Sequence, residues 1–265
     1  MSTFEDHLAA LDLELFARIP AQLTDADRRS LLAVQHALRE RIPHYTYLEI
    51  GSHLGGSIQP HLLDERCGRI YSIDKRPLAV ADERGYKVPY PENSTAHMLK
   101  LLREVNPQAD ERIICFDADA SGVDPAAIAP SPHLCLIDGE HTDRAATADY
   151  AFCRKVMGEH GVVLFHDGNI IYSALAGILE SLGSEGTPFH AYALPSSVFV
   201  IEFGEVDLHK SAPIARMLID NHEQYLFGLL SLEHYREVYN RKPIRMIRAV
   251  WQAWLSTKHA LRGAR

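Results

Sequence analysis

The chain has 265 residues, of which 46% are hydrophobic and 23% are charged, and its formal net charge is -8 at pH 7. This composition is typical of a folded globular protein and argues against a disordered or low-complexity chain. The negative charge argues against a general nucleic-acid binder, because phosphate contacts need a basic surface. The longest apolar runs have about five residues, whereas a membrane-spanning helix needs roughly 20, so we expect no membrane partner.

The N-terminus and the cysteines bear on the cellular compartment. The first ten residues carry Glu5 and Asp6 and no basic cluster, which is not the pattern of a signal peptide. The four cysteines occur singly, at Cys67, Cys115, Cys135 and Cys153. Isolated cysteines favour reduced thiols over a zinc site, since metal thiolates usually come in closely spaced pairs. These features predict a cytoplasmic protein.

Residues 1–43 are predicted to form a helical extension packed on the main domain. The apolar positions that recur at helix spacing are Phe4, Leu8, Leu11 and Leu15. Pro20 ends this first segment, and Thr24 is suited to be the N-cap of a second helix. Asp25 and Asp27 then fall in its first turn, where the helix dipole favours negative charge. Such an extension could also cover a substrate pocket.

Residues 44–205 alternate short apolar runs with helix-compatible segments. The runs are Tyr45–Ile50, Arg69–Ile73, Arg112–Phe116, His133–Ile137, Gly161–His166 and Ser197–Phe203. The helical segments lie at about 56–66, 94–105, 142–157 and 170–182. This alternation predicts an α/β domain of the Rossmann-like, doubly wound type, with a mostly parallel sheet between helices. The last run could close the sheet as an antiparallel edge strand.

Residues 206–265 are predicted to form a second helical extension, with two amphipathic helices. Its apolar positions are Met217, Leu218, Tyr225, Leu229, Ile244, Ile247, Trp251 and Trp254. The aromatic stripe is typical of a packing face. It fits a lid over a pocket as well as an interface between subunits, and we expect a homodimer.

The turn after the first predicted strand is rich in glycine. It runs from Glu49 through Gly51 and Gly55 to Ser57, and glycine there lets the backbone approach a ligand closely. The spacing G-x-x-x-G is neither the dinucleotide fingerprint nor a phosphate-binding NTPase loop. Asp74 ends the second strand, where a carboxylate can accept the hydroxyls of a ribose. Together they favour an adenosine-containing ligand.

Carboxylates and imidazoles follow the fourth and fifth predicted strands. The fourth ends in Asp138, with His141 three residues later, and the fifth ends in His166 and Asp167. Neighbouring strands lie about 5 Å apart, so these groups could converge, and two carboxylates that meet repel unless a cation or proton lies between them. A divalent metal held by Asp138, His166 and Asp167 would resolve the repulsion. Otherwise, the carboxylates cap the following helices and His166 packs.

At these residues the chain resembles the class I S-adenosylmethionine-dependent methyltransferases, specifically the methyltransferase family 24 type. The motifs are Leu48–Gly51 with Ser57, then Ile137–His141, then Gly161–Asp167. The resemblance covers about residues 45–203 and implies the Rossmann-like fold. It also implies S-adenosylmethionine as cofactor, a divalent metal (Mg, Mn or Fe), and transfer of a methyl group to a hydroxyl of a small molecule, a sugar or a natural product.

The resemblance assigns roles to individual residues. Glu49, Gly51 and Ser57 would line the methionine end of the cofactor, with Ser52 and Gly55 of the same turn and with Asp138. Asp74 would hold the ribose, and Asp119, after the third strand, would lie near the adenine. Asp138, His166 and Asp167 match the metal ligands of metal-dependent members, although acidic or amide residues are usual where His166 stands.

His141 is the residue we expect to act as general base, with Asp138 as the other catalytic residue. His141 could instead cap a helix beside Asp138, and without a metal His166 or His141 would act directly.

Three competing functions stay open: other metal chemistry on the same scaffold (hydrolysis or oxygen activation), a non-catalytic nucleotide-binding module, and an NAD-dependent oxidoreductase. The missing G-x-G-x-x-G disfavours the last.

Overall fold

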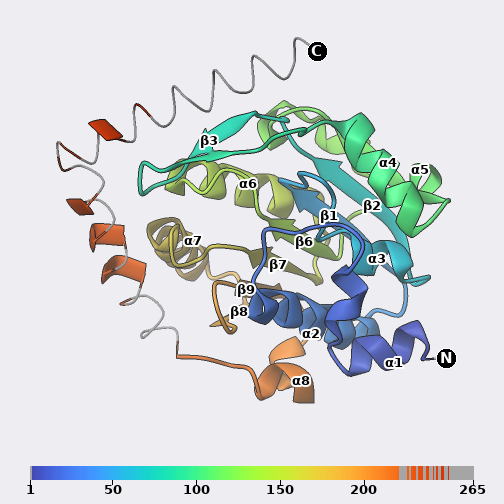
Figure 1. Cartoon of the computed structure of the whole chain (residues 1–265). Coiled ribbons are helices and arrows are strands. Elements are labelled where there is room, and N and C mark those ends of the chain that lie inside the picture. The colour runs from blue at the N-terminus through green and yellow to red at the C-terminus, as the bar shows by residue number, and fades with distance from the viewer. Residues whose placement is uncertain are drawn as a thin grey trace, which may run out of the picture.

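A seven-stranded sheet forms the centre of the computed structural model, which describes residues 2–220 and scattered positions between 226 and 250. The strand order is β5-β2-β1-β6-β7-β9-β8, and Figure 1 shows this sheet running through the middle of the molecule. The pairs β5–β2, β2–β1, β1–β6 and β6–β7 are parallel. The order reverses between β1 and β6, so their carboxyl ends flank the switch point where ligands bind in such sheets.

The five parallel strands lie where the apolar runs predicted them. Their bounds are β1 Tyr45–Ile50, β2 Cys67–Ile73, β5 Ile113–Phe116, β6 Leu134–Ile137 and β7 Gly161–Phe165. Every residue of β1, β6 and β7 is buried, as expected for strands covered by helices on both faces. The Rossmann-like fold predicted from the alternation of runs and helices is confirmed.

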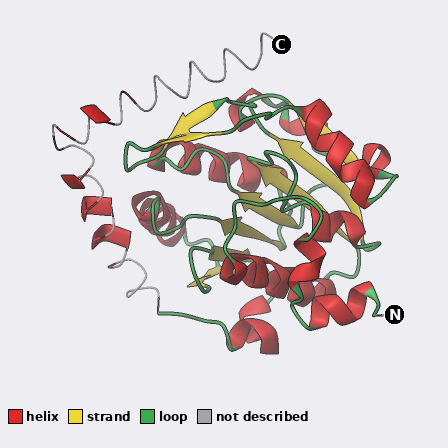
Figure 2. Ribbon diagram, in the orientation of Figure 1, coloured by secondary structure: helices red, strands yellow, loops and turns green. Residues whose placement is uncertain are grey.

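Helices cover both faces of the sheet (Figure 2). One face packs against α1 Phe4–Ala9, α2 Asp25–Arg41, α3 Gln59–Leu63, α4 Thr95–Val105 and α8 Ala212–Ala215. The other packs against α6 Asp143–Val156 and α7 Tyr172–Glu185. The short α5 spans Ala109–Arg112, beside β5. The predicted helices at 94–105, 142–157 and 170–182 are confirmed, whereas the one at 56–66 shrinks to five residues.

The antiparallel strands correct one expectation. The last predicted run forms β9 Phe199–Phe203, which is antiparallel to β7 as expected but is not the edge of the sheet. A strand that the sequence did not predict, β8 Phe189–Ala193, pairs antiparallel with β9 and forms the edge. Its first three residues are partly or fully exposed, so the run lacks the continuous apolar character that identified the buried strands.

Within the N-terminal extension, the predicted N-cap at Thr24 is confirmed. The prediction of one continuous first helix is wrong. The Thr24 side chain accepts from the amide of Asp27, and the Asp27 side chain accepts in return from that of Thr24, which is a capping box. The first helix instead ends at Ala9 and is followed by a 3-10 turn, η1 Leu13–Phe16. Leu11 lies between them and has a φ of 50°, a left-handed conformation that interrupts the helix although the apolar residues continue at helix spacing.

A second small sheet lies in the segment between β2 and α4. It is a hairpin of β3 Ala79–Ala81 and β4 Lys87–Pro89, which the sequence did not predict. Its loop reaches the segment after β6, because the amide of Glu83 donates to the carbonyl of His141 (2.9 Å). The Glu83 carboxylate in turn accepts from the amide of Asp143 (2.9 Å), so the hairpin is fastened to the start of α6.

Beyond β9 the chain forms a 3-10 turn, η4 Leu208–Lys210, and then α8. The expected helix through Met217 and Leu218 is not present, since α8 ends at Ala215 and Ile219 bridges to Ala193. Tyr225, Ile244, Trp251 and Trp254 lie outside the described residues. Among the described residues, none of the helices is both long enough and apolar enough to cross a bilayer.

Candidate active site

Two adjoining pockets open at the carboxyl ends of β1 and β6. Both are lined by Gly51, His53, Tyr90 and Asp138, so they share a wall. Gly51 has a φ of 95°, and a Cβ at this position would collide with the backbone of Asp138 and Gly139. Only glycine therefore lets the turn after β1 approach the end of β6 this closely.

The first pocket extends over the ends of β2 and β5 and has an acidic lining. It includes five acidic side chains, at Asp74, Asp119, Asp138, Glu140 and Asp149, against two basic ones, at Lys75 and Arg144. Lys75 pairs with Glu140 (2.8 Å) and with Asp119 (3.3 Å). Burial raises the pKa of Asp149 to about 7, and the nearby charge of Asp119 adds to this. The pocket is thus suited to a ligand that carries positive charge.

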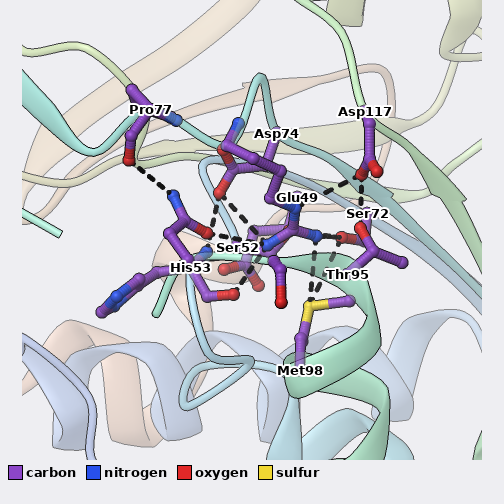
Figure 3. Close-up of polar contacts among 12 residues, drawn as sticks. Glu49, Ser52, His53, Ser72, Asp74, Pro77, Thr95, Met98 and Asp117 are labelled. Carbon is purple, nitrogen blue, oxygen red and sulfur yellow. Dashed lines mark hydrogen bonds and ion pairs between the residues drawn. The ribbon is translucent and has the colours of Figure 1, made fainter. Parts of the chain in front are cut away.

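Asp74 is held at the mouth of this pocket by backbone amides. Its Oδ2 accepts from the amide of His53 (2.9 Å) and its Oδ1 from the amide of Arg76 (2.7 Å). Figure 3 shows Asp74 and His53 close together at the ends of their strands. A carboxylate offers about four acceptor positions, and Arg76 also donates to Oδ2 (3.5 Å), so Asp74 retains capacity for one hydroxyl donor of a ligand.

Arg76 joins the loops around Asp74, and sequence reasoning missed it. Its guanidinium donates to the carbonyl of His53 (2.7 Å) and to the side-chain oxygen of Asn93 (3.2 Å), and it pairs with Asp74 (3.5 Å). It also reaches Ser72 (3.4 Å), whose labelled side chain is visible in Figure 3. Its side chain is only 8% exposed, so these contacts form a buried network. No motif of the sequence signals it.

Glu49 lies beneath the glycine turn and lines neither pocket. Its carboxyl is completely buried and accepts from the hydroxyls of Ser57 (2.5 Å) and Tyr47 (2.8 Å). Burial raises the pKa of Glu49 to about 8, which the hydrogen bonds from Ser57 and Tyr47 only partly offset. Glu49 therefore supports the turn from below. Ser52 and Ser57 line the second pocket, whereas Gly55 lines neither pocket and packs against Leu102.

The second pocket contains the carboxylates and imidazoles predicted to converge. Asp138 Oδ1 lies 2.8 Å from His166 Nδ1 and 3.2 Å from His141 Nε2. Asp167 Oδ2 lies 3.3 Å from His141 Nδ1 and 3.9 Å from His166 Nδ1. Asp167 has a φ of 53°, a left-handed conformation that turns the chain sharply after β7. The spatial convergence expected from the strand ends is therefore present.

Asp27 from the N-terminal extension completes this cluster, and it was expected only as a carboxylate in the first turn of a helix, favoured there by the helix dipole. Its Oδ2 lies 3.5 Å from His166 Nε2, while its Oδ1 accepts from the amide of Ser197 (3.0 Å). The Asp27 side chain is 1% exposed. His166 therefore lies between two carboxylates, one at each ring nitrogen. The sequence signal was present in the capping motif of Thr24 and Asp27, but nothing linked that motif to β7.

These contacts set the protonation states of the cluster. Burial alone would lower the pKa of His166, but Asp138 and Asp27 outweigh it and hold that pKa well above its usual value. Burial would likewise raise the pKa of Asp138, yet His166 and His141 lower it to about 2. The pKa of Asp27 is lowered for the same reason, since the contacts with His166 outweigh its burial. These shifts favour an ionised Asp138, an ionised Asp27 and a protonated His166.

The N-terminal extension and the small hairpin cover the second pocket. Residues 20–23 line it on one side, and Arg84, Val88 and Tyr90 line it on another. The expectation that the N-terminal extension could cover a pocket therefore agrees with the position of these residues. Both covering segments also contact the cluster, because Asp27 of α2 lies beside His166 and the hairpin is hydrogen-bonded to the carbonyl of His141.

The family model described as a methyltransferase domain of family 24 matches residues 48–168. No curated protein matches the chain significantly in sequence. Among solved structures, the chain is similar to MycE methyltransferase from the mycinamycin biosynthetic pathway, described in complex with Mg and SAH. The identity is 16%, the TM-score is 0.49, and the match covers 76% of this chain and 55% of that one.

Two further solved structures are similar. CalS11, a calicheamicin methyltransferase, shares 14% identity over 77% of this chain and 95% of its own, with a TM-score of 0.49. The O-methyltransferase TomG from Streptomyces achromogenes, described in complex with SAM, shares 12% identity over 77% and 90%, with a TM-score of 0.48. Residues 48–168 of the chain are thus similar to the methyltransferase domain of family 24 type. The match to a methyltransferase domain agrees with the enzyme class that the sequence motifs implied.

Proposed function

We propose that the protein transfers the methyl group of S-adenosylmethionine to a hydroxyl of a small molecule, a sugar or a natural product. The observation that carries the proposal is the shared wall of the two pockets at Gly51 and Asp138. One pocket suits the donor and the other the acceptor, so the transferred methyl group would cross beside these two residues. Holding the two partners in line supplies much of the rate of such a displacement.

The donor side is supported by charge. S-adenosylmethionine carries a sulfonium and an ammonium group, and acidic side chains outnumber basic ones in the lining of the first pocket. Asp74 would accept from the ribose, and Asp119 would lie near the adenine. Ser52 and Gly51 would lie at the methionine end, with Glu49, Gly55 and Ser57 supporting the turn behind them. The pyrophosphate of NAD would meet the same carboxylates unfavourably.

His141 would act as general base on the acceptor side. Its ring lies between two carboxylates, with Nδ1 3.3 Å from Asp167 and Nε2 3.2 Å from Asp138. In the neutral imidazole one of these nitrogens carries no proton, and that nitrogen would take the hydroxyl proton. The hydroxyl oxygen then forms a bond to the methyl carbon while the carbon–sulfur bond breaks. The electron pair of that bond goes to sulfur, and S-adenosylhomocysteine leaves.

The residues present fit a divalent metal. Ligand atoms of Asp138, His141 and His166 all lie within 4.8 Å of one another. Asp27 accepts at His166 Nε2, so Nδ1 beside Asp138 would become a ligand atom when the metal replaces its proton, the usual carboxylate–histidine–metal arrangement. Asp138 and His166 would hold the ion with Asp167 nearby, and oxygen-rich ligation with imidazole suits Mn or Fe(II) better than Mg. When bound, such an ion lowers the pKa of an acceptor hydroxyl and orients it.

The proposal is tested by binding and transfer. Calorimetric titration with S-adenosylhomocysteine should show binding, and titration with NAD should not. Methyl transfer from labelled cofactor to a panel of sugars and phenolic natural products should be lost in Asp138→Ala. The His141→Gln variant should still bind the cofactor. Loss of transfer on chelation, restored by Mn or Fe(II), would establish the metal. Absence of cofactor binding would overturn the proposal, and binding without transfer to any acceptor would favour the non-catalytic module.

The remaining expectations stay proposals. A cytoplasmic location is supported by four free cysteines. Homodimerisation through residues 206–265 and the division into 1–43, 44–205 and 206–265 rest on the sequence pattern alone, and most of the last segment lies outside the described residues.

A further inference from the structure

A second cluster of potential metal ligands lies away from the two pockets. It consists of His190 on β8 and of Asp207 and His209 in the turn after β9, and ligand atoms of all three lie within 4.8 Å of one another. His190 pairs with Glu202 across the edge of the sheet, and Glu202 pairs with Val162, near the amino end of β7. The active-site groups follow the carboxyl ends of the strands, so this cluster lies toward the other end of the sheet.

Glu202 orients His209 within the cluster. Its carboxylate is 1% exposed and accepts from the amides of Leu208 (3.0 Å) and His209 (2.8 Å) and from the hydroxyl of Tyr192. It also lies 3.1 Å from His209 Nδ1. A carboxylate can only accept there, so Nδ1 carries the proton and Nε2 keeps its lone pair. This hydrogen bond is the one that a metal-binding imidazole usually makes through its second nitrogen.

The other two members face the same point. The ring of His190 lies 4.2 Å from that of His209, centroid to centroid. Asp207 has a φ of 48°, and this left-handed turn brings its carboxylate back toward the imidazoles. Lys210 pairs with Asp207 at 2.9 Å, but the lysine is 60% exposed. An exposed ion pair of this kind contributes little, so a divalent cation would displace Lys210 readily.

We propose that His190, Asp207 and His209 bind a zinc ion, or another borderline transition metal such as Ni or Co. Two imidazoles and one carboxylate are ligands that such ions prefer, whereas Mg and Ca prefer oxygen alone. Three protein ligands leave the fourth position to water. The ion would join the edge strand β8 to the turn that leads into α8, and thereby stabilise this edge of the sheet.

The experiment uses the full-length protein, freed of metal and titrated with zinc chloride by calorimetry. The double variant His190→Gln/His209→Gln is compared with His44→Gln, which removes an exposed histidine outside the cluster. Wild type and His44→Gln should bind one more zinc ion than the double variant, and zinc should raise their melting temperature more. Glu202→Gln should retain the site with about 10- to 100-fold weaker affinity.

Asp138→Ala separates this cluster from the active site, because it removes a ligand only there. It should keep the zinc ion that the double variant loses. Equal zinc binding by the folded double variant and His44→Gln would overturn the proposal. Loss of all zinc binding in Asp138→Ala would overturn it as well. Neither outcome depends on methyl transfer, so failure here is distinct from failure of the proposed function.

Discussion

The carboxylate of Asp27 faces His166, with 3.5 Å between Oδ2 and Nε2, although the two residues belong to the N-terminal extension and to the end of the central sheet. On the other side of the ring, Asp138 Oδ1 lies 2.8 Å from His166 Nδ1. The orientation of His166 is therefore fixed from both sides. The extension therefore contributes a side chain to the proposed active site in addition to supporting the fold.

Asp27→Asn is expected to lower methyl transfer by about 10- to 100-fold, because partners that orient a ligand or an acid–base group typically contribute this much. The affinity for S-adenosylhomocysteine should not change, since Asp27 lines neither pocket. The control is Asp25→Asn, which alters an exposed carboxylate of the same helical turn. Steady-state rates and calorimetry on the same preparations measure both effects. Full activity of Asp27→Asn would contradict the role given to it.

Gly51→Ala is expected to destabilise the protein by about 2 kcal/mol or more and to abolish cofactor binding. The left-handed backbone conformation opposes a side chain, and the added Cβ would also collide with the backbone of Asp138. Gly68→Ala is the matched control, because no atom lies within 4 Å of the Cβ that it adds. Urea denaturation gives the two free energies of unfolding. A Gly51→Ala protein as stable as Gly68→Ala would show that the turn can move away from β6.

The buried Glu49 predicts a pH-dependent stability. Its pKa is about 8 in the folded protein against an ordinary value of 4.5, so between these values the folded state holds a proton that the unfolded state has lost. Its contribution to stability is thus fully present below about pH 4.5 and is lost as the pH rises to 8, with a slope of up to about 1.4 kcal/mol per pH unit.

Glu49→Gln removes this titration while it keeps the shape of the side chain. Urea denaturation at several values between pH 5 and pH 8 should show the variant gaining stability relative to wild type as the pH rises. The contributions of the other titrating groups cancel when the free energy of unfolding of one protein is subtracted from that of the other. A constant difference over that range would mean that Glu49 is ionised in the folded state.

Arg76→Lys tests the network beside Asp74. A lysine cannot reach His53, Asn93 and Ser72 together, and the loss of one or two hydrogen bonds at about 1 kcal/mol each predicts roughly tenfold weaker binding of S-adenosylhomocysteine. The rate at saturating cofactor should change little. Arg69→Lys serves as control, because Arg69 donates to the exposed carbonyl of Glu111 away from the pockets. Unchanged affinity in Arg76→Lys would remove Arg76 from the cofactor site.

The parts of the fold that sequence reasoning found are those with strong local signals. The buried strands have continuous apolar runs, and the capping box at Thr24 marks the start of α2 by itself. The hairpin β3–β4 was missed because its strands have three residues each and none of these is fully buried. Strand β8 was missed for a similar reason, since His190 interrupts its apolar pattern.

The residues of the candidate site likewise fall into those that the sequence could predict and those that it could not. Asp138, His166 and Asp167 could be placed together because parallel strands end at one edge of a sheet. Asp27 could not be added, because its contact with His166 depends on how α2 packs across the sheet. Arg76 was missed because its partners come from four separate segments. Contacts of this kind follow from tertiary packing and leave no spacing in the sequence.

The second pocket is lined by residues 20–23, only a few positions before Asp27 on the same short stretch of chain. One segment of the chain therefore influences both which acceptor fits the pocket and how His166 is oriented for the reaction. A chimera that receives its first 43 residues from a relative would exchange both properties at once. Diversification of acceptor choice by recombination at this terminus would succeed only among relatives that also supply a carboxylate to His166.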